Sequence, residues 1–199
     1  MTPVDEFSGY SSDSASDSNG VQFAESGSDG DVTAGEPLFN AQCVSDGPFA
    51  GLEVLYFEDI YRPHCLLRGF DKRLVEFRDA LRPEALQELL SATDYRSLNL
   101  GLENGPHIAI PKSVNGDFSL HSAPADPVFF LHHTQLDRLW WRWQQMDIEA
   151  RSHEYEGLSA THSEKQATLD DKLHMGGLIP ELKVADILRT ETEVLCYRY

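Results

Sequence analysis

The stretch that begins at Asp126 combines a metal-binding side chain with the pattern of a helix able to position it. Asp126 is a good N-cap acceptor, and Pro127 fits the first helical position, where its missing N–H costs nothing. The apolar and aromatic residues that follow predict a helix over 127–145. His133 and Asp137 fall one turn apart on its aromatic face. An imidazole placed one turn from a carboxylate is typical of a metal ligand with a hydrogen-bonding partner.

The order D-P-x-F-F-x-H-H-x-x-x-D-R-x-W in this stretch resembles the second copper-site signature of the tyrosinase family. That family includes polyphenol oxidases, catechol oxidases and the oxygen-carrying hemocyanins. Carried over by position, the motif makes His133 the copper ligand, and Asp137 is expected to orient an imidazole. His132 lies about 100° further round the helix, so we expect it to support the site rather than share the metal from the same face.

The wider sequence is similar to filamentous-fungal tyrosinase-like proteins from about residue 40 to residue 199. Segments 43–49, 63–68, 105–107 and 196–199 carry this likeness together with the copper-site helix. The resemblance implies a mainly α-helical domain over 38–199, part of a tyrosinase-type four-helix bundle with irregular flanks. Its helices are expected near 82–103 and 127–145, and an acidic Ser/Gly-rich tail without fixed structure is expected over 1–37.

In this family two copper ions bind dioxygen between them, and each copper is held by three histidines on facing helices. The family pattern needs a histidine-rich first copper site upstream of Cys43, whereas the first histidine here is His64. The sequence therefore carries the second copper site without the first.

The second copper site also departs from the family pattern, which places two ligands on one helix as H-x-x-x-H. His107 supplies the first, but Pro111 occupies the second position and is expected to end the helix there. Two residues could substitute as ligands, Glu103 and His121, although a helix-end carboxylate and a loop histidine are the plainer interpretations. Ile108 matches the position that borders the substrate in family members.

Other elements follow from local patterns. Residues 52–57 predict a short strand, and Leu81 to Ala92 predicts a helix with Pro83 near its start. Thr93 is expected to cap a further helix towards residue 103. The remaining histidines lie in polar or irregular surroundings, which favours solvated side chains over ligands; they are His64, His153, His162 and His174.

The acidic balance excludes several classes of partner. The net charge is −17, and residues 1–61 hold 12 Asp and Glu with no Lys or Arg. Nucleic acids and anionic membrane surfaces attract basic patches, so neither is expected as a partner. No apolar run is long enough for a membrane span, and no secretory signal is visible, which favours the cytoplasm if Met1 is the native start.

Three cysteines lack the C-x-x-C spacing of a zinc site. Cys43 and Cys65 could form a disulfide in an oxidising compartment, leaving Cys196 free, and the sequence leaves this open.

The resemblance implies a copper-binding oxidoreductase domain of the family that oxidises small phenols or o-diphenols to quinones with dioxygen. His107 and His133 are the expected copper ligands, and no catalytic residue is assigned. The alternative is a non-catalytic or truncated remnant of the fold, or a subunit that another chain completes. Without the first-site helices, several aromatic residues are expected to lose cover and favour self-association or a partner chain: Phe129, Phe130, Trp140, Trp141 and Trp143.

Overall fold

The computed structural model describes residues 41–57, 60–70, 77–159 and 164–199. The expected tail over 1–37 and His162 lie outside the described residues. The described residues form two compact units, which we call the helical unit and the hairpin unit. The helical unit contains 77–110, 130–159 and 164–199, and the hairpin unit contains 41–57, 60–70 and 111–129.

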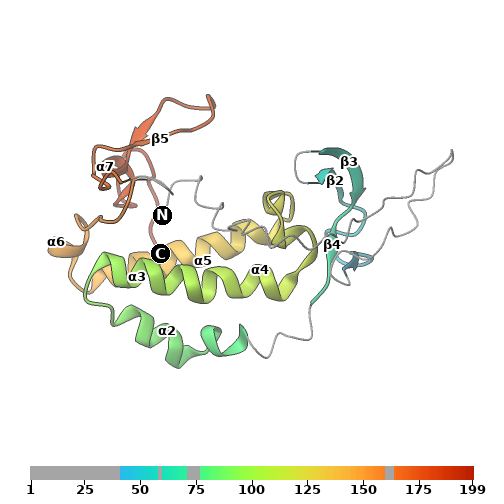
Figure 1. Cartoon of the computed structure of the whole chain (residues 1–199), viewed down its shortest axis with the longest axis horizontal. Coiled ribbons are helices and arrows are strands. Elements are labelled where there is room, and N and C mark those ends of the chain that lie inside the picture. The colour runs from blue at the N-terminus through green and yellow to red at the C-terminus, as the bar shows by residue number, and fades with distance from the viewer. Residues whose placement is uncertain (1–40, 58–59, 71–76, 160–163) are drawn as a thin grey trace. The chain divides into compact units, whose positions relative to one another are not determined.

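The fold is mainly α-helical, as predicted. After the short turn η3 (Asp79–Leu81), the main helices are α2 (Pro83–Leu90), α3 (Tyr95–Leu102), α4 (Ile108–Val114) and α5 (Val128–Gln145), with a wide turn η4 (Glu103–His107) between α3 and α4. Shorter elements follow: α6 (Ile148–Arg151), β5 (Lys172–Leu173), β6 (Leu182–Lys183) and α7 (Val184–Ile187). Figure 1 shows α3 and α5 side by side. Among the described residues, no helix combines the length and hydrophobicity of a membrane span.

Local capping explains where two of the helices begin. The Asp126 carboxylate accepts a hydrogen bond from the N–H of Val128 at 2.9 Å, which confirms the predicted start of α5. The predicted cap of α3 was wrong by one residue. Asp94, not Thr93, accepts the N–H of Ser97 at 2.8 Å, because it directly precedes the first helical residue.

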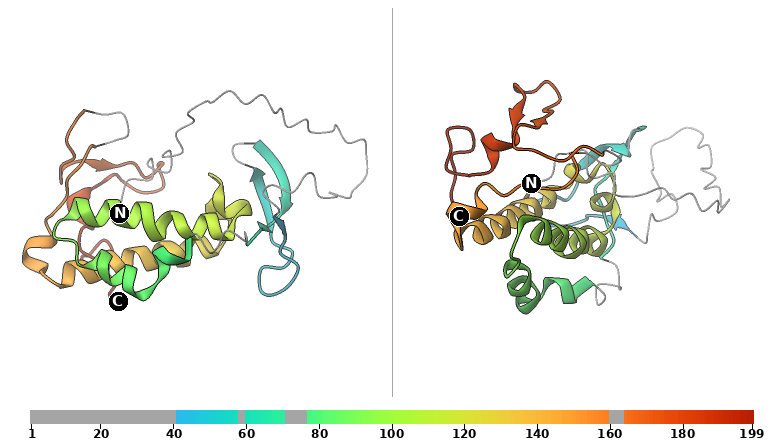
Figure 2. Two further views of the ribbon diagram at one scale, coloured as in Figure 1. Left: turned by 60° about the horizontal axis from the view of Figure 1, so that its bottom comes forward. Right: turned by 60° about the vertical axis from the view of Figure 1, so that its left-hand side comes forward.

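The core of the helical unit joins α2, α3 and α5 to the C-terminal segment. Its buried members are Leu90, Tyr95, Leu98, Leu139, Trp140, Trp143, Val184 and Leu188. Trp143 is fully buried, and its Nε1–H donates to the carbonyl of Ala92 at 2.7 Å. In both views of Figure 2 the red C-terminal segment lies beside one end of these helices. The expectation that Trp140 and Trp143 lose their cover was therefore wrong, whereas Phe130 is exposed.

The expected end of the helix at Pro111 was also wrong, since α4 continues through it to Val114. Pro111 is the fourth residue of α4, so its missing N–H removes only the first intrahelical hydrogen bond, the one to the carbonyl of His107. The helix is interrupted earlier, at Gly105, whose backbone leaves the helical region (φ −106°, ψ −110°). Gly105 directly precedes Pro106. Helical geometry is disfavoured at the residue before a proline, which accounts for the wide turn.

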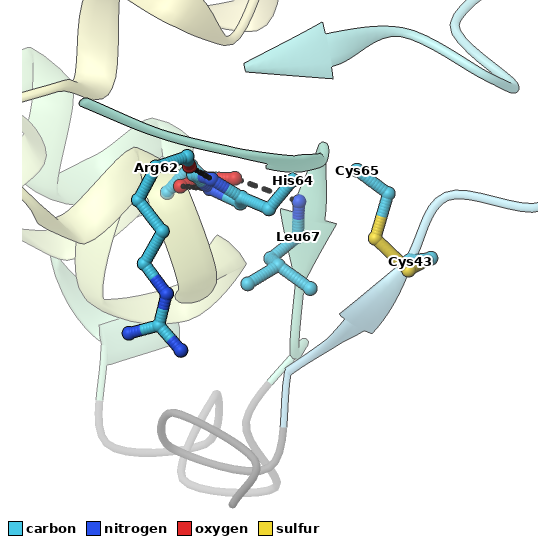
Figure 3. The surroundings of a disulfide bond; sticks show 6 residues. Cys43, Arg62, His64, Cys65 and Leu67 are labelled. Carbon is cyan, nitrogen blue, oxygen red and sulfur yellow. Dashed lines mark hydrogen bonds and ion pairs between the residues drawn. A yellow bond between two sulfur atoms is a disulfide. The ribbon is translucent and has the colours of Figure 1, made fainter. Parts of the chain in front are cut away.

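The hairpin unit is built from short strands and turns. Its elements are β1 (Gln42–Cys43), β2 (Glu53–Phe57), β3 (Ile60–Cys65), β4 (Leu67–Arg68), η5 (Gly116–Ser119) and η6 (Ala123–Ala125). Strands β2 and β3 pair antiparallel, as do β1 and β4, and β2 confirms the predicted strand. A disulfide joins Cys43 to Cys65, and Cys196 is free and exposed. Figure 3 shows this disulfide beside His64 and Leu67.

Two buried carboxylates organise the hairpin unit. Asp117 is fully buried and accepts hydrogen bonds from His64 Nε2 at 2.9 Å and from the N–H of Leu67 at 2.8 Å. Asp126 is also fully buried and forms two 2.8 Å hydrogen bonds with Arg68. The expectation that His64 is solvated was wrong, because its side chain is only 10% exposed and is held by Asp117.

Candidate metal centre

Three histidines of the helical unit gather into one group. His107 ends the turn η4, and His132 and His133 lie on the second turn of α5. One ring nitrogen from each lies within 4.8 Å of the other two. The ring of His133 stands edge-on to both neighbours, with centroids 5.3 Å from His107 and 5.3 Å from His132. Among the described residues this is the one group of three or more side chains with the geometry to hold a metal.

Glu103 fixes which ring nitrogen of His107 carries the hydrogen. The two residues lie four apart across the kink at Gly105, and Glu103 Oε2 is 2.6 Å from His107 Nδ1. An ionised carboxylate only accepts, so Nδ1 carries the hydrogen and the lone pair is at Nε2, an atom buried from solvent. A carboxylate on the far nitrogen is the usual support of a metal-ligating histidine, since it fixes the tautomer and the ring orientation.

The two α5 histidines are held neutral. His132 is 8% exposed and His133 is half-buried. The pKa of each ring is lowered to about 4, mainly by burial; for His133 the neighbouring His107 contributes to the lowering and Glu103 partly opposes it. Neutral imidazole is the form that binds a metal, so this pair is ready to ligate at neutral pH.

His132 differs from His133 in its hydrogen bonding. Its Nε2 lies 3.1 Å from the carbonyl oxygen of His107. A carbonyl oxygen only accepts, so Nε2 is the protonated nitrogen and the lone pair of His132 is at Nδ1. The rings of His107 and His132 are stacked at 5.9 Å with 13° between their planes.

Asp137 contacts the C-terminal segment instead of an imidazole. Its buried carboxylate accepts hydrogen bonds from the hydroxyls of Tyr197 and Tyr199, both at 2.6 Å. Burial, and then the bond to Asp137, raises the pKa of both tyrosines, so both stay protonated donors. Asp137 thus ties the last residues of the described chain to α5, one turn beyond His133.

The other sequence-predicted site residues are placed as follows. Ile108 is half-buried and directly follows His107 at the start of α4. Glu103 acts on His107 and is not a member of the three-histidine group. His121 is an exposed turn residue of the hairpin unit and is likewise outside that group.

The sequence reasoning missed that His132 reaches the same group as His133. The 100° angle between adjacent helical residues describes where the Cβ atoms point, whereas two imidazoles can both lean towards a third ring on a neighbouring element. The adjacent pair His132-His133 was the available signal. No signal in the sequence pointed to the hydrogen bond from His132, because its acceptor is the backbone oxygen of a residue 25 positions away.

Comparison with known proteins defines the class of this chain. The family model described as the common central domain of tyrosinase matches residues 5–146. The chain belongs to the tyrosinase family.

Individual relatives are fungal. The chain is 40% identical to tyrosinase ustQ of Aspergillus flavus, over 87% of this chain and 49% of that protein. It is 37% identical to the tyrosinase-like protein phomQ1 of Diaporthe leptostromiformis, over 87% of this chain and 50% of the relative. The fold resembles a polyphenol oxidase (mutant G292N) from Thermothelomyces thermophila, with a TM-score of 0.67 and 24% identity over 79% of this chain and 51% of that one. The chain thus spans about half the length of these relatives.

Proposed function

We propose that this chain is a copper-binding domain of a tyrosinase-like oxidase and that it holds copper through His107 and His133. The observation that carries the proposal is the group of three imidazoles with ring nitrogens within 4.8 Å of one another. Imidazole suits copper, and the lowered pKa values of His132 and His133 keep these rings neutral. The donor set therefore fits the metal that the family binds.

The residues around the metal would have separate tasks. Glu103 holds the hydrogen on Nδ1 of His107 and so would leave the Nε2 lone pair available to a metal. The buried ring of His132 would limit the access of water to the group. Ile108 would border a small phenolic substrate. Bound copper would supply the redox chemistry with which the family oxidises phenols or o-diphenols to quinones by dioxygen.

A dinuclear centre would need ligands that this sequence does not offer. It contains 8 histidines, none of them before His64, and the described residues gather one group of three. We therefore propose that this chain supplies one copper site and that further sequence or another chain supplies the second. The coverage of about half of each relative's length supports this division.

A second candidate function is copper binding without oxidation. Pro111 favours it, because it stands where the family pattern places a ligand and offers no donor atom. The two candidate functions differ in whether the copper-loaded chain oxidises a substrate once the second copper site is supplied.

Copper titration of the full chain, followed by calorimetry and electron paramagnetic resonance, tests the binding. We expect one copper(II) per chain with the signal of an isolated ion. His133→Ala should abolish stoichiometric uptake, and His121→Ala is the matched control that should not. Uptake that survives in His133→Ala would overturn the ligand assignment, and two coupled, signal-silent ions per chain would overturn the single-site proposal.

Complementation separates the two candidates. The full chain is co-expressed with the part of the Aspergillus flavus relative that it does not span, and oxygen uptake is measured with catechol. Uptake that depends on His133 supports the oxidase proposal. If both parts are present and loaded with copper but no oxygen uptake is measured, the non-catalytic candidate is supported and the oxidase proposal is rejected.

A further inference from the structure

The carbonyl of His107 lacks the donor that an α-helix would normally give it. In a helix that carbonyl accepts from the N–H four residues later, and that residue is Pro111, which has no N–H. A carbonyl that loses its helical donor needs another donor where water does not reach it, because an unsatisfied polar group is costly away from water.

His132 supplies a donor at this position. Its Nε2 is 3.1 Å from the His107 oxygen, and His132, the donor residue, is only 8% exposed. The ring N–H of His132 therefore stands in for the backbone N–H that Pro111 cannot provide.

We infer that His132 is a positioning residue: its ring N–H replaces the missing N–H of Pro111 and so holds His107 opposite His133. His107 is then fixed at two points, its side chain by Glu103 and its backbone by His132. Because His132 directly precedes His133, the same bond sets the spacing between the two proposed copper ligands. The copper part of this inference rests on the proposed function.

This role also decides which atom of His132 is available to a metal. With the hydrogen on Nε2, only Nδ1 keeps a lone pair. A ligand role for His132 and a positioning role make different predictions, because a positioning residue needs only the N–H, whereas a ligand needs the lone pair.

Four variants of the full chain separate these roles. His132→Gln keeps a side-chain N–H donor, and His132→Phe keeps a ring but removes the donor. Pro111→Ala restores the backbone N–H at residue 111, and the double variant Pro111→Ala/His132→Phe asks whether that N–H makes His132 dispensable. Copper affinity is measured by competition with a chelator, and the stability of the metal-free chain by urea unfolding.

We expect His132→Phe to weaken copper binding by about 10- to 100-fold, the usual effect of losing a group that orients a ligand. His132→Gln should weaken it much less, and the effect of His132→Phe should largely disappear in the Pro111→Ala background. If His132→Gln is as damaging as His132→Phe, or if Pro111→Ala gives no relief, the positioning role is rejected.

The tautomer gives a test that needs neither variants nor copper. Long-range ¹H–¹⁵N spectra of the metal-free chain with labelled histidine should show His132 with its hydrogen on Nε2, and a hydrogen on Nδ1 would reject the inference. A chain that binds no copper but shows this tautomer and the same coupling in urea unfolding would refute the proposed function and leave the positioning role standing.

Discussion

The helical unit and the hairpin unit are stabilised by different means. The helical unit buries a continuous cluster of large apolar side chains around Trp140 and Trp143. The hairpin unit buries few large side chains, among them Leu66 and Phe118, and relies on a disulfide and two fully buried carboxylates. The comparison indicates that short strands too small to bury much apolar area are held by covalent and charged contacts instead.

The largest effect should come from breaking the apolar core. Trp143→Ala removes a fully buried ring and its hydrogen bond to Ala92. We expect the free energy of unfolding of the helical unit to fall by about 3–5 kcal/mol, the range for emptying such a site. Urea unfolding followed by circular dichroism measures it. Phe130→Ala, at 60% exposure, is the control and should cost far less; equal costs would contradict the described core.

The sequence predicted what local patterns control. The start of α5 followed from Asp126 and Pro127, and its length followed from the apolar period. The motif singled out His107 and His133, which lie in one group in the structure, and their binding of copper stays a prediction. What the sequence could not show depends on contacts between distant residues. The Asp117 partner of His64 is 53 positions away, and the core cluster that contains Trp143 is completed by Val184 and Leu188 of the C-terminal segment. The hydrophobic pattern indicates that a face is buried, but not that Val184 and Leu188 join the same core cluster.

Pro111 illustrates a different limit. The general cost of proline inside a helix predicted a break there, whereas the structure loses one hydrogen bond and replaces it by a side-chain donor. Sequence rules give the cost of a residue in isolation, and a tertiary contact can offset it.

Reducing the disulfide should have the next largest effect, a loss of stability confined to the hairpin unit. Cys43 and Cys65 are 22 positions apart, and closing a loop of this size contributes about 3 kcal/mol. We expect faster amide exchange in β1 to β4 after reduction, with the core amides of α5 little changed. Cys196→Ser is the control for thiol chemistry at the free cysteine. Exchange that rises equally in α5 would mean that the two units are not stabilised separately.

Polar contacts in the helical unit should matter less than its core. Tyr199→Phe removes one of the two hydroxyls that donate to Asp137. Since Asp137 keeps its bond to Tyr197, we expect a loss of about 1 kcal/mol after allowing for the partial exposure of the tyrosine. The double variant Tyr197→Phe/Tyr199→Phe leaves the buried carboxylate without either donor and should lose more than the sum of the single variants. Strict additivity in urea unfolding would show that the two hydroxyls act independently.

The smallest expected effect is the response of the helical unit to mild acid. The folded pKa of His133 is lowered to about 4, whereas an unfolded histidine titrates near 6.5. Between these values the unfolded chain binds a proton that the folded chain does not, so the free energy of unfolding should decrease as the pH falls through this window.

Well above pH 6.5 the His133 ring is neutral in both the folded and the unfolded chain, so it should not change how the free energy of unfolding depends on pH. His133→Gln removes this titration, so its loss of stability between pH 7 and pH 5 should be smaller than that of the unchanged metal-free chain. We expect a difference of about 1 kcal/mol after discounting for solvent screening. Urea unfolding at a series of pH values measures it, with His153→Gln as the control at an exposed histidine. Parallel pH profiles for His133→Gln and the unchanged chain would mean that His133 is accessible to solvent, and the premise of a buried, neutral ligand would fail.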